Sequence, residues 1–299
     1  MFKRLVVVGV GLIGGSFALG LKRAELVQHV VGVGRGTANL QQALQLGVID
    51  EIGLDPASSY AGADLIFIAT PVGQMGAIMA AMAPHLSPTA IITDGGSTKQ
   101  DVVALAEEHL AQHLERFVPA HPIAGAEKSG VEAAFATLYV GKKTVLTPSP
   151  RAAPEALLQV QSAWEACGAR VSTMSPELHD KVFAAVSHLP HLLAFALVDE
   201  IAAKPHADLL FDFAASGFRD STRIAGAHPE MWRDIMLANR DATLTELDEY
   251  LAQLQRVRAH LAAGDSAALT QVFTRARDAR ALWQARIEAG APPNQGPGA

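Results

Sequence analysis

Cysteine is almost absent from this sequence. The 299 residues include one, Cys167, so no disulfide can form within the chain. It stands at the expected end of a helix, and no motif of thiol catalysis surrounds it. We therefore expect Cys167 to be a small buried residue without a chemical role.

Basic blocks and long apolar runs are absent as well. The formal net charge is −6, which makes nucleic acid and anionic membrane surfaces poor candidates for partners. The apolar run near Met1 meets a glycine turn after four residues, too early for a signal peptide. No uninterrupted apolar span reaches the length that crosses a membrane. With 49% hydrophobic and 18% charged residues, we expect a cytoplasmic globular protein and no membrane partner.

The first half of the chain alternates short β-rich runs with helical patterns. Strands are expected at 5–8, 30–33, 65–69, 90–93, 117–120, 143–147 and 169–173, and helices at 11–23, 37–46, 73–83, 98–113 and 153–167. This alternation predicts an α/β domain over residues 1–173 with a parallel, doubly wound sheet of the Rossmann type. A chain of 299 residues is long enough for a second domain.

From Ser175 onward apolar residues recur at helical spacing, and strand signals are few. Ser175, Pro176 and Glu177 supply a capping hydroxyl, a proline at the first helical position and an acid in the first turn. Further helices are expected at 206–215, 229–238, 241–262 and 266–288. We predict an all-α domain over 174–288 and a disordered tail over 289–299. The long apolar helix favours a homodimer, although a core within this domain would also account for it.

Gly9, Gly11 and Gly14 form a GxGxxG pattern between the first expected strand and helix. In a dinucleotide-binding turn, the first glycine permits the tight turn, the second lets a pyrophosphate approach, and the third lets helix and strand pack. The phosphates would rest on backbone N–H groups where Leu12 and Ile13 begin the helix. A purely structural turn is the alternative.

The second strand lacks the carboxylate that usually ends it in NAD-binding folds. Gly34, Arg35, Gly36 and Thr37 stand there instead. Gly34 leaves room, and Arg35 and Thr37 can bind a 2′-phosphate through charge-assisted hydrogen bonds. We therefore predict that NADP is preferred, with NAD as a second cofactor. A solvated Arg35 without this role is the alternative.

Two further segments lie at the carboxyl ends of expected strands, the edge where ligands bind in open α/β sheets. Thr70 and Pro71 follow the strand at 65–69, and Ser97 follows the strand at 90–93. We expect all three to contact the cofactor, with Ser97 also within reach of the substrate. The alternative for Ser97 is that it only caps the helix beginning there.

Histidines of the candidate site occur in both halves of the chain. His121 follows the fifth expected strand and therefore faces the cofactor edge, with Glu127 in the polar cluster after it. His188 and His191 share one helix face, on which Pro190 frees a carbonyl and predicts a local kink. A metal site is disfavoured, because no Glu or Cys pattern completes the ligand set.

Three arginines follow, at positions 219, 223 and 233. Two or more of them could clamp an anionic substrate through bidentate hydrogen bonds. Arg233 stands beside Asp234, and for this arginine we expect a surface ion pair instead.

Nine motifs of this chain occur in one order: GVGLIGGS (9–16), ATPV (69–72), TDGGSTK (93–99), HPIAGAEKSGV (121–131), LTPSP (146–150), MSPELHD (174–180), VSHLPH (186–191), GFRDSTRIA (217–225) and PEMWRD (229–234). In these motifs the chain resembles the prephenate/arogenate (cyclohexadienyl) dehydrogenase family of tyrosine biosynthesis. The resemblance implies an NAD(P)-binding domain, a helical dimerisation domain and an active site in the cleft between them. It implies oxidative decarboxylation of prephenate or arogenate to 4-hydroxyphenylpyruvate or tyrosine.

Roles for individual residues follow from the same resemblance. His121 would hydrogen-bond the ring hydroxyl as base or polariser, Ser97 would orient that histidine and the nicotinamide, and Arg223 would bind the ring carboxylate. The remaining assignments are His191 and Arg219 for the side-chain carboxylate, His188 and Trp232 as walls of the site, and Glu127 as a gate or polar partner at the cleft.

The substrate stays open between prephenate and arogenate. Relatives also carry lysine at the position of Arg219, and the small Ala126 lies where keto and amino side chains could be told apart. No mutase-like or regulatory domain is visible, so we expect a monofunctional enzyme. The rival interpretations are a 3-hydroxyacid- or imine-type NADP dehydrogenase, which leaves the histidine and arginine motifs unexplained, and a non-catalytic NADP-sensing regulator.

Overall fold

The computed structural model describes residues 1–125 and 128–289. The chain divides into two compact units, one spanning Met1–Arg240 and the other beginning at Asp241, and each is described by itself. The tail expected at 289–299 lies, from residue 290 on, outside the described residues.

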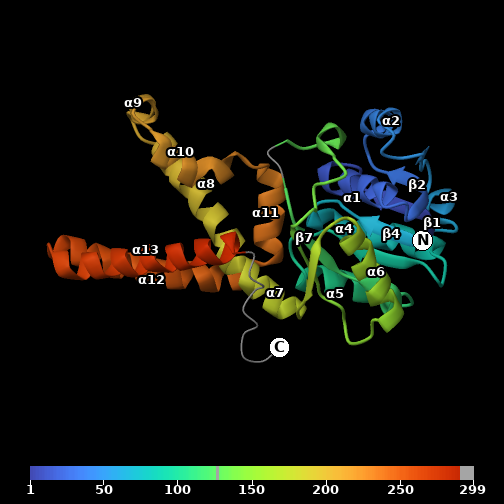
Figure 1. Ribbon diagram of the computed structural model, residues 1–299. Helices are drawn as coiled ribbons and strands as arrows, with labels where there is room; N and C mark the ends of the chain where they lie inside the picture. Colours follow the sequence, from blue (N-terminus) through green and yellow to red (C-terminus); the bar gives the residue numbers. More distant parts are fainter. Residues whose placement is uncertain (126–127, 290–299) are drawn as a thin grey trace. The chain divides into compact units, whose positions relative to one another are not determined.

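A six-stranded parallel sheet forms the core of the first unit (Figure 1). Its strands are β1 (Phe2–Val8), β2 (Val27–Val33), β3 (Glu51–Ile52), β4 (Leu65–Ile68), β5 (Ile91–Asp94) and β6 (Phe117–Val118). The strand order β3-β2-β1-β4-β5-β6 is that of dinucleotide-binding sheets. The predicted doubly wound sheet is therefore confirmed, with the short β3 as a strand that the sequence did not predict.

Apolar helices cover both faces of this sheet. Helices α1 (Leu12–Arg23), α2 (Thr37–Gln45) and α6 (Pro154–Ala166) contribute to one buried cluster. Helices α3 (Pro56–Tyr60), α4 (Val72–Met82) and α5 (Gln100–His109) contribute to the other. Along β1, Leu5 and Val7 belong to the first cluster and Val6 and Val8 to the second. This alternation explains why a strand buried on both faces is apolar throughout.

A second, three-stranded sheet contains β7 (Ala120–Ile123), β8 (Lys143–Leu146) and β9 (Arg170–Thr173). The strand expected at 117–120 is thus split, because the chain leaves the first sheet after Val118 and β7 pairs antiparallel with β8. Pro122 fits β7 because this strand lies at the edge of its sheet. The strands expected at 143–147 and 169–173 exist, but they extend this second sheet and not the first.

One long helical segment begins where the second sheet ends. It comprises α7 (Pro176–Phe183), a π-helical stretch at Ala184–His188 and α8 (Leu189–Ala202). Ser175 caps α7, accepting a hydrogen bond from the Leu178 N–H. The π-helical stretch lies directly before Pro190, where the missing amide hydrogen predicted a local distortion.

By length and composition alone, residues Pro176–Ala202 could also cross a membrane, with a mean hydropathy of 1.6 and 28% of the apolar window buried. The segment is not an uninterrupted apolar run, because it contains His188, His191, Asp199 and Glu200. Two polar residues of this helix, His179 and Asp180, are nevertheless fully buried in the first unit, so part of the helix belongs to the protein core.

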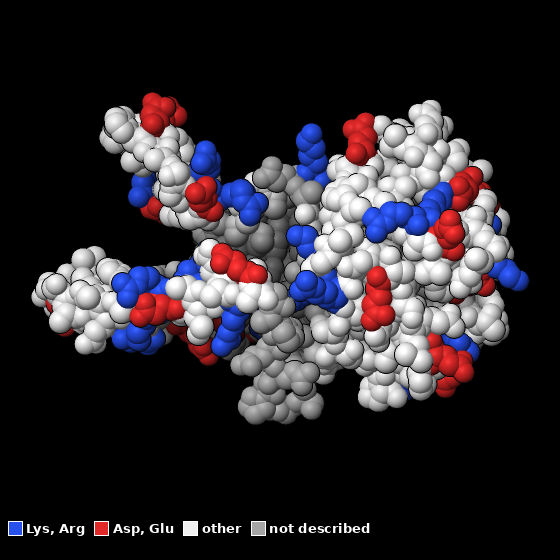
Figure 2. All heavy atoms as spheres, in the orientation of Figure 1, with Lys and Arg blue, Asp and Glu red and all other residues white. Residues whose placement is uncertain are grey.

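Three shorter helices complete the first unit: α9 (Ala207–Asp212), α10 (Ser216–Thr222) and α11 (Pro229–Ala238). Helix α11 packs on α4, and its Trp232 and Ile235 join the second cluster of the nucleotide-binding sheet. The second unit holds most of α12 (Arg240–Ala262) and all of α13 (Ser266–Glu288). On the face in view in Figure 2, basic and acidic side chains are interspersed over the nucleotide-binding part.

Candidate active site

The glycine turn between β1 and α1 has the geometry that a pyrophosphate requires. Gly9 has φ +96°, and a Cβ there would lie 2.6 Å from the Ala69 carbonyl oxygen. A Cβ on Gly14 would lie 2.2 Å from the Gly9 oxygen, whereas a Cβ on Gly11 would meet no atom within 4 Å. The fold itself therefore requires Gly9 and Gly14, while Gly11 keeps the surface of the turn open to a ligand.

The end of β2 carries no acid. Gly34, Arg35, Gly36 and Thr37 are all exposed, and Thr37 begins α2. A Cβ on Gly34 would make only ordinary contact with Leu40, at 3.7 Å, so the backbone does not demand glycine here. The side chain of Arg35 is thus exposed at an edge of the sheet that carries no carboxylate.

The ends of β4 and β5 lie beside the glycine turn. Thr70 touches it, since a Cβ on Gly9 would lie 2.9 Å from Cγ2 of Thr70, and Pro71 precedes α4. The Thr70 hydroxyl is buried without a hydrogen-bond partner in the described part of the chain. Ser97 lies on the loop after β5.

The hypothesis that Ser97 caps a helix is wrong. Helix α5 begins at Gln100, and the carboxylate of Asp180 accepts hydrogen bonds from the backbone N–H groups of Lys99 and Gln100, both at 2.9 Å. The cap comes from α7, because that helix packs against the start of α5. Such a tertiary cap leaves no signal in the local sequence.

His121 lies within strand β7, whereas the sequence predicted that it follows a strand. The residue as a whole is partly exposed. Its Nδ1 lies 2.8 Å from Nε2 of His179, and the ring packs against Phe183 with centroids 4.7 Å apart. The imidazole is therefore held from the side of α7.

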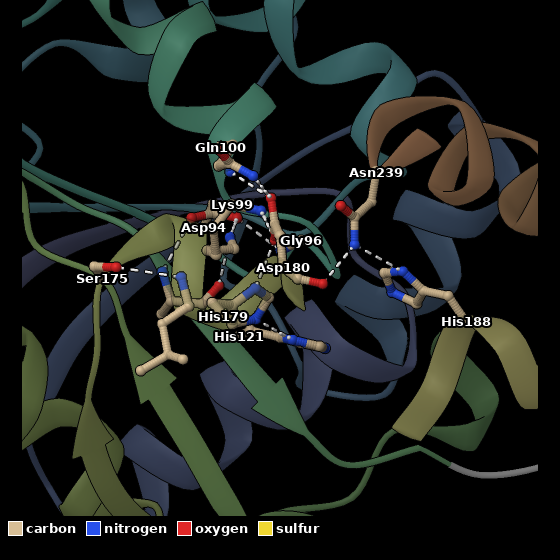
Figure 3. A network of polar contacts seen from close by, with 12 residues as sticks. Asp94, Gly96, Lys99, Gln100, His121, Ser175, His179, Asp180, His188 and Asn239 are labelled. Atoms are coloured by element: carbon tan, nitrogen blue, oxygen red, sulfur yellow. Dashed lines mark hydrogen bonds and ion pairs between the residues drawn. The ribbon is translucent and has the colours of Figure 1, made fainter. Parts of the chain in front are cut away.

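His179 and Asp180 belong to the candidate site through their contacts, and the sequence did not predict them. Nδ1 of His179 lies 2.7 Å from Oδ1 of Asp180, and both side chains are essentially inaccessible. Figure 3 shows His121, His179 and Asp180 in a row of polar contacts that ends at the start of α5. The available signal was that His179 and Asp180 follow Leu178 within the motif MSPELHD, in which Glu177 and Lys181 on the same helix are exposed while these two residues are buried.

A buried ion pair holds the backbone next to His121. Lys99 Nζ binds Asp94 Oδ2 and donates to the Ala120 carbonyl at 2.9 Å. The Ala120 N–H donates to Asp94 Oδ1 at 3.1 Å. Both charged side chains are fully buried, so the pair fixes the point where the chain passes from the first sheet to the second.

Three further residues of the helical part gather around His188. Asn239 Nδ2 lies 3.1 Å from Nδ1 of His188 and 2.8 Å from the Asp180 carbonyl oxygen. The ring of His191 stacks on Trp232, and His188 meets the same indole at 6.2 Å. The structure thus brings together His188, His191 and Trp232, as predicted, and adds Asn239.

Burial and neighbouring charge keep these histidines neutral. Burial, followed by the neighbouring His179, Lys99 and His188, holds the pKa of His121 well below its ordinary range. Burial likewise lowers the pKa of His179, and it lowers that of His188 to about 4. Near neutral pH each ring is therefore a neutral imidazole with one donor and one acceptor nitrogen.

The predicted arginines are at the surface. Arg223 is exposed at the start of the turn after α10, and its charge contributes, after burial, to the lowered pKa of His191. Arg219 is 78% exposed and lies 3.6 Å from Asp220. Arg233 pairs with Asp234 at 2.7 Å, which confirms the expected surface ion pair. Glu127, together with Ala126, lies outside the described residues.

Comparison with known proteins finds relatives over nearly the whole chain. The model of the prephenate dehydrogenase nucleotide-binding domain matches residues 17–173, and that of the prephenate dehydrogenase dimerization domain matches residues 175–275. Cyclohexadienyl dehydrogenase of Zymomonas mobilis is 35% identical over 284 residues, 94% of this chain and 96% of its own.

Two further relatives agree. Prephenate dehydrogenase of Bacillus subtilis is 37% identical over 281 residues, 92% of this chain and 75% of its own. Prephenate dehydrogenase of Aquifex aeolicus, crystallised with hydroxyphenyl propionate and NAD⁺, superposes with a TM-score of 0.88 at 36% identity, covering 94% of this chain and 98% of that one.

Proposed function

Since this chain belongs to the prephenate dehydrogenase family of NAD(P)-dependent oxidoreductases, we propose that it oxidatively decarboxylates prephenate or arogenate in tyrosine biosynthesis. The observation that carries the proposal is the partly exposed His121, held by His179 at the carboxyl end of the nucleotide-binding sheet. A dehydrogenase needs such a group beside its cofactor, because a hydroxyl that becomes a carbonyl must lose its proton.

The cofactor would lie across the glycine turn. Gly11 leaves space for the pyrophosphate, the N–H groups that begin α1 would bind its oxygens, and Thr70, Pro71 and Ser97 would line the nicotinamide end. When bound, the nicotinamide accepts the hydride from the substrate ring. Its position is supported by the unpartnered Thr70 hydroxyl, which a ligand can satisfy.

We propose that NADP is preferred over NAD. Arg35 and Thr37 are exposed at the end of β2, and no carboxylate stands at positions 34–37 to repel a 2′-phosphate. Arg35→Ala should reduce kcat/KM for NADP at least tenfold and change that for NAD little. A strong NAD preference in the unaltered enzyme would contradict this part of the proposal.

In this mechanism the protein positions the substrate and moves one proton. His121 would accept the proton of the ring hydroxyl while the ring carboxylate leaves as CO₂. Aromatisation supplies much of the driving force, so positioning suffices. Ser97 would help to orient the histidine and the nicotinamide.

Arginine side chains would supply the positive charge that holds the dianionic substrate, with a histidine beside them. Arg223 would bind the ring carboxylate, and His191 and Arg219 the side-chain carboxylate, with His188 and Trp232 as walls. Glu127 would act as a gate or polar partner. The influence of Arg223 on the pKa of His191 supports placing these two side chains near one ligand.

An absorbance assay with both substrates and both cofactors tests the reaction, since the reduced nicotinamide is detected directly. His121→Asn should leave substrate affinity nearly unchanged and lower kcat by about 10²- to 10⁴-fold. Arg223→Ala should instead raise KM, and Arg233→Ala, on the exposed pair with Asp234, is its matched control. Near-normal turnover of His121→Asn across pH would overturn the assigned role.

We also propose a cytoplasmic homodimer, with residues 1–173 binding the cofactor and residues 174–288 forming the dimer. Apolar side chains on the helical part support the dimer, among them Val186 at 66% and Leu197 at 43% exposure, because a second copy would bury them. Light scattering after size-exclusion chromatography should give twice the 31.5 kDa chain mass; a stable monomer would contradict it.

A further inference from the structure

Asp180 is placed to control two histidines through two different groups. Its carboxylate faces His179, which in turn faces His121, and its backbone carbonyl faces Asn239, which in turn faces His188 (Figure 3). In a neutral imidazole one nitrogen carries the proton and the other the lone pair, and the partner of one nitrogen decides the state of the other.

The contacts that start at the Asp180 carboxylate leave a lone pair on Nε2 of His121. Burial alone would raise the pKa of Asp180, but hydrogen bonds from His179 and from the N–H groups of Gln100 and Lys99 outweigh it and leave the pKa below its ordinary value. The ionised carboxylate only accepts, so His179 must donate from Nδ1 and accept at Nε2. His121 must therefore donate from Nδ1, which leaves its Nε2 as the lone pair that a base requires.

The contacts that start at the Asp180 backbone carbonyl leave a proton on Nε2 of His188. A backbone carbonyl only accepts, so Asn239 must turn its NH₂ group toward Asp180, with 2.8 Å between the atoms. The same nitrogen lies 3.1 Å from Nδ1 of His188, which must then accept. The proton of neutral His188 is left on Nε2. This atom is buried, and a backbone hydrogen-bonding interaction with Ser97 raises the pKa of the ring.

We propose that Asp180 is a positioning residue that fixes the proton positions of His121 and His188, its carboxylate making His121 an acceptor and its carbonyl making His188 a donor. The site then offers the substrate one basic nitrogen, on His121, while the ring of His188 stays uncharged with its proton on the nitrogen that faces away from Asn239. This inference rests on the proposed function for its use of His121, but the proton positions themselves do not depend on it.

The proton positions can be measured in the free protein by ¹⁵N NMR of labelled histidine, with no substrate or cofactor present. We expect His121 and His179 to carry the proton on Nδ1 and His188 to carry it on Nε2. Finding the proton of His121 on Nε2, or that of His188 on Nδ1, would overturn the proposal without any variant.

Two substitutions should test the contacts of the Asp180 carboxylate and those of its carbonyl independently. Asp180→Ala removes the carboxylate and keeps the carbonyl, so it should abolish the Nδ1–H preference of His121 and leave His188 unchanged. Asn239→Leu should abolish the Nε2–H preference of His188 and leave the proton of His121 on Nδ1. An unchanged His121 signal in Asp180→Ala, or an unchanged His188 signal in Asn239→Leu, would overturn the assignment.

Kinetics add a readout that lost stability alone would not give. Asp180→Ala should lower kcat about 10²-fold or more while KM changes less than threefold, because a misplaced proton disables the base and leaves binding intact. Ser175→Ala is the structural control, since it removes the cap of the same helix without touching Asp180, and should leave both proton positions and kcat as they are. If the proton of His121 moves while kcat is unchanged, the proton-position assignment holds and the proposed role of His121 as base is wrong.

Discussion

The imidazole of His191 lies on the indole of Trp232, with ring centroids 3.6 Å apart and planes inclined by 19°. The histidine comes from α8 and the tryptophan from α11. Nδ1 of His191 also donates to the Ser187 carbonyl at 2.8 Å, so both the position and the direction of this ring are set.

Replacing Trp232 should therefore affect substrate binding more than chemistry. Trp232→Leu removes the stacking surface, and we expect KM for the substrate to rise about tenfold, the effect of about 1.4 kcal/mol, with kcat within threefold. Steady-state kinetics measure both constants. Trp232→Phe keeps an aromatic face and should recover most of the affinity; a leucine variant with unchanged KM would show that the stack does not orient His191 for the substrate.

The glycine turn offers a matched pair of substitutions. Gly14→Ala should destabilise the nucleotide-binding domain by several kcal/mol, because its Cβ would lie 2.2 Å from the Gly9 oxygen. Gly11→Ala should leave the free energy of unfolding within about 1 kcal/mol, since its Cβ meets open space, but weaken cofactor binding at least tenfold. Urea unfolding and cofactor titration by fluorescence separate the two effects. Unimpaired cofactor binding by Gly11→Ala would place the pyrophosphate elsewhere.

Removing one charge of the buried Lys99–Asp94 pair should destabilise the protein more than removing both charges. Lys99→Met leaves Asp94 buried without its cation, and we expect a loss of about 3–5 kcal/mol in the free energy of unfolding. The double variant Lys99→Met/Asp94→Asn should recover a large part of this loss, because no uncompensated charge remains. Urea unfolding measures both proteins. A single variant that loses less than about 1 kcal/mol would mean that water reaches Asp94.

The free energy of unfolding should depend on pH through His188. Its pKa is 6.5 in the unfolded chain and about 4 in the fold, so between these values the unfolded chain binds more protons. The neutral buried ring therefore contributes fully above pH 6.5, and its contribution, on the order of 3 kcal/mol, is lost as the pH falls toward 4. Burial is the largest cause of this shift; Asp180 and the backbone of Ser97 oppose it, and His179 and His191 add to it.

Urea unfolding of the unaltered protein and of His188→Gln, measured from pH 4.5 to 8, tests this prediction. His121 and His179 shift in the same direction, so only the difference between the two proteins isolates His188. Parallel pH profiles for both proteins would show that His188 titrates normally in the fold.

Local patterns in the sequence predicted the nucleotide-binding half well. The continuous apolar runs of β1 and β4, the glycine turn and the cap of α7 each depend on residues close together in the chain. Where the prediction failed, a distant residue made the difference. The start of α5 is capped by Asp180 of another helix, and the strand at 117–120 splits because β7 pairs with β8.

The sequence by itself determined the family and the class of fold, because ordered motifs and short-range periodicity record them, and it predicted the residues proposed to contact cofactor and substrate. The tertiary structure alone decided how those residues work together. It placed His179 and Asp180 behind His121 and put Asn239 between Asp180 and His188. The physical reason is that the proton position of a buried histidine depends on which atom lies within about 3 Å of each ring nitrogen, and contacts between residues so far apart along the chain exist only once the helices have packed.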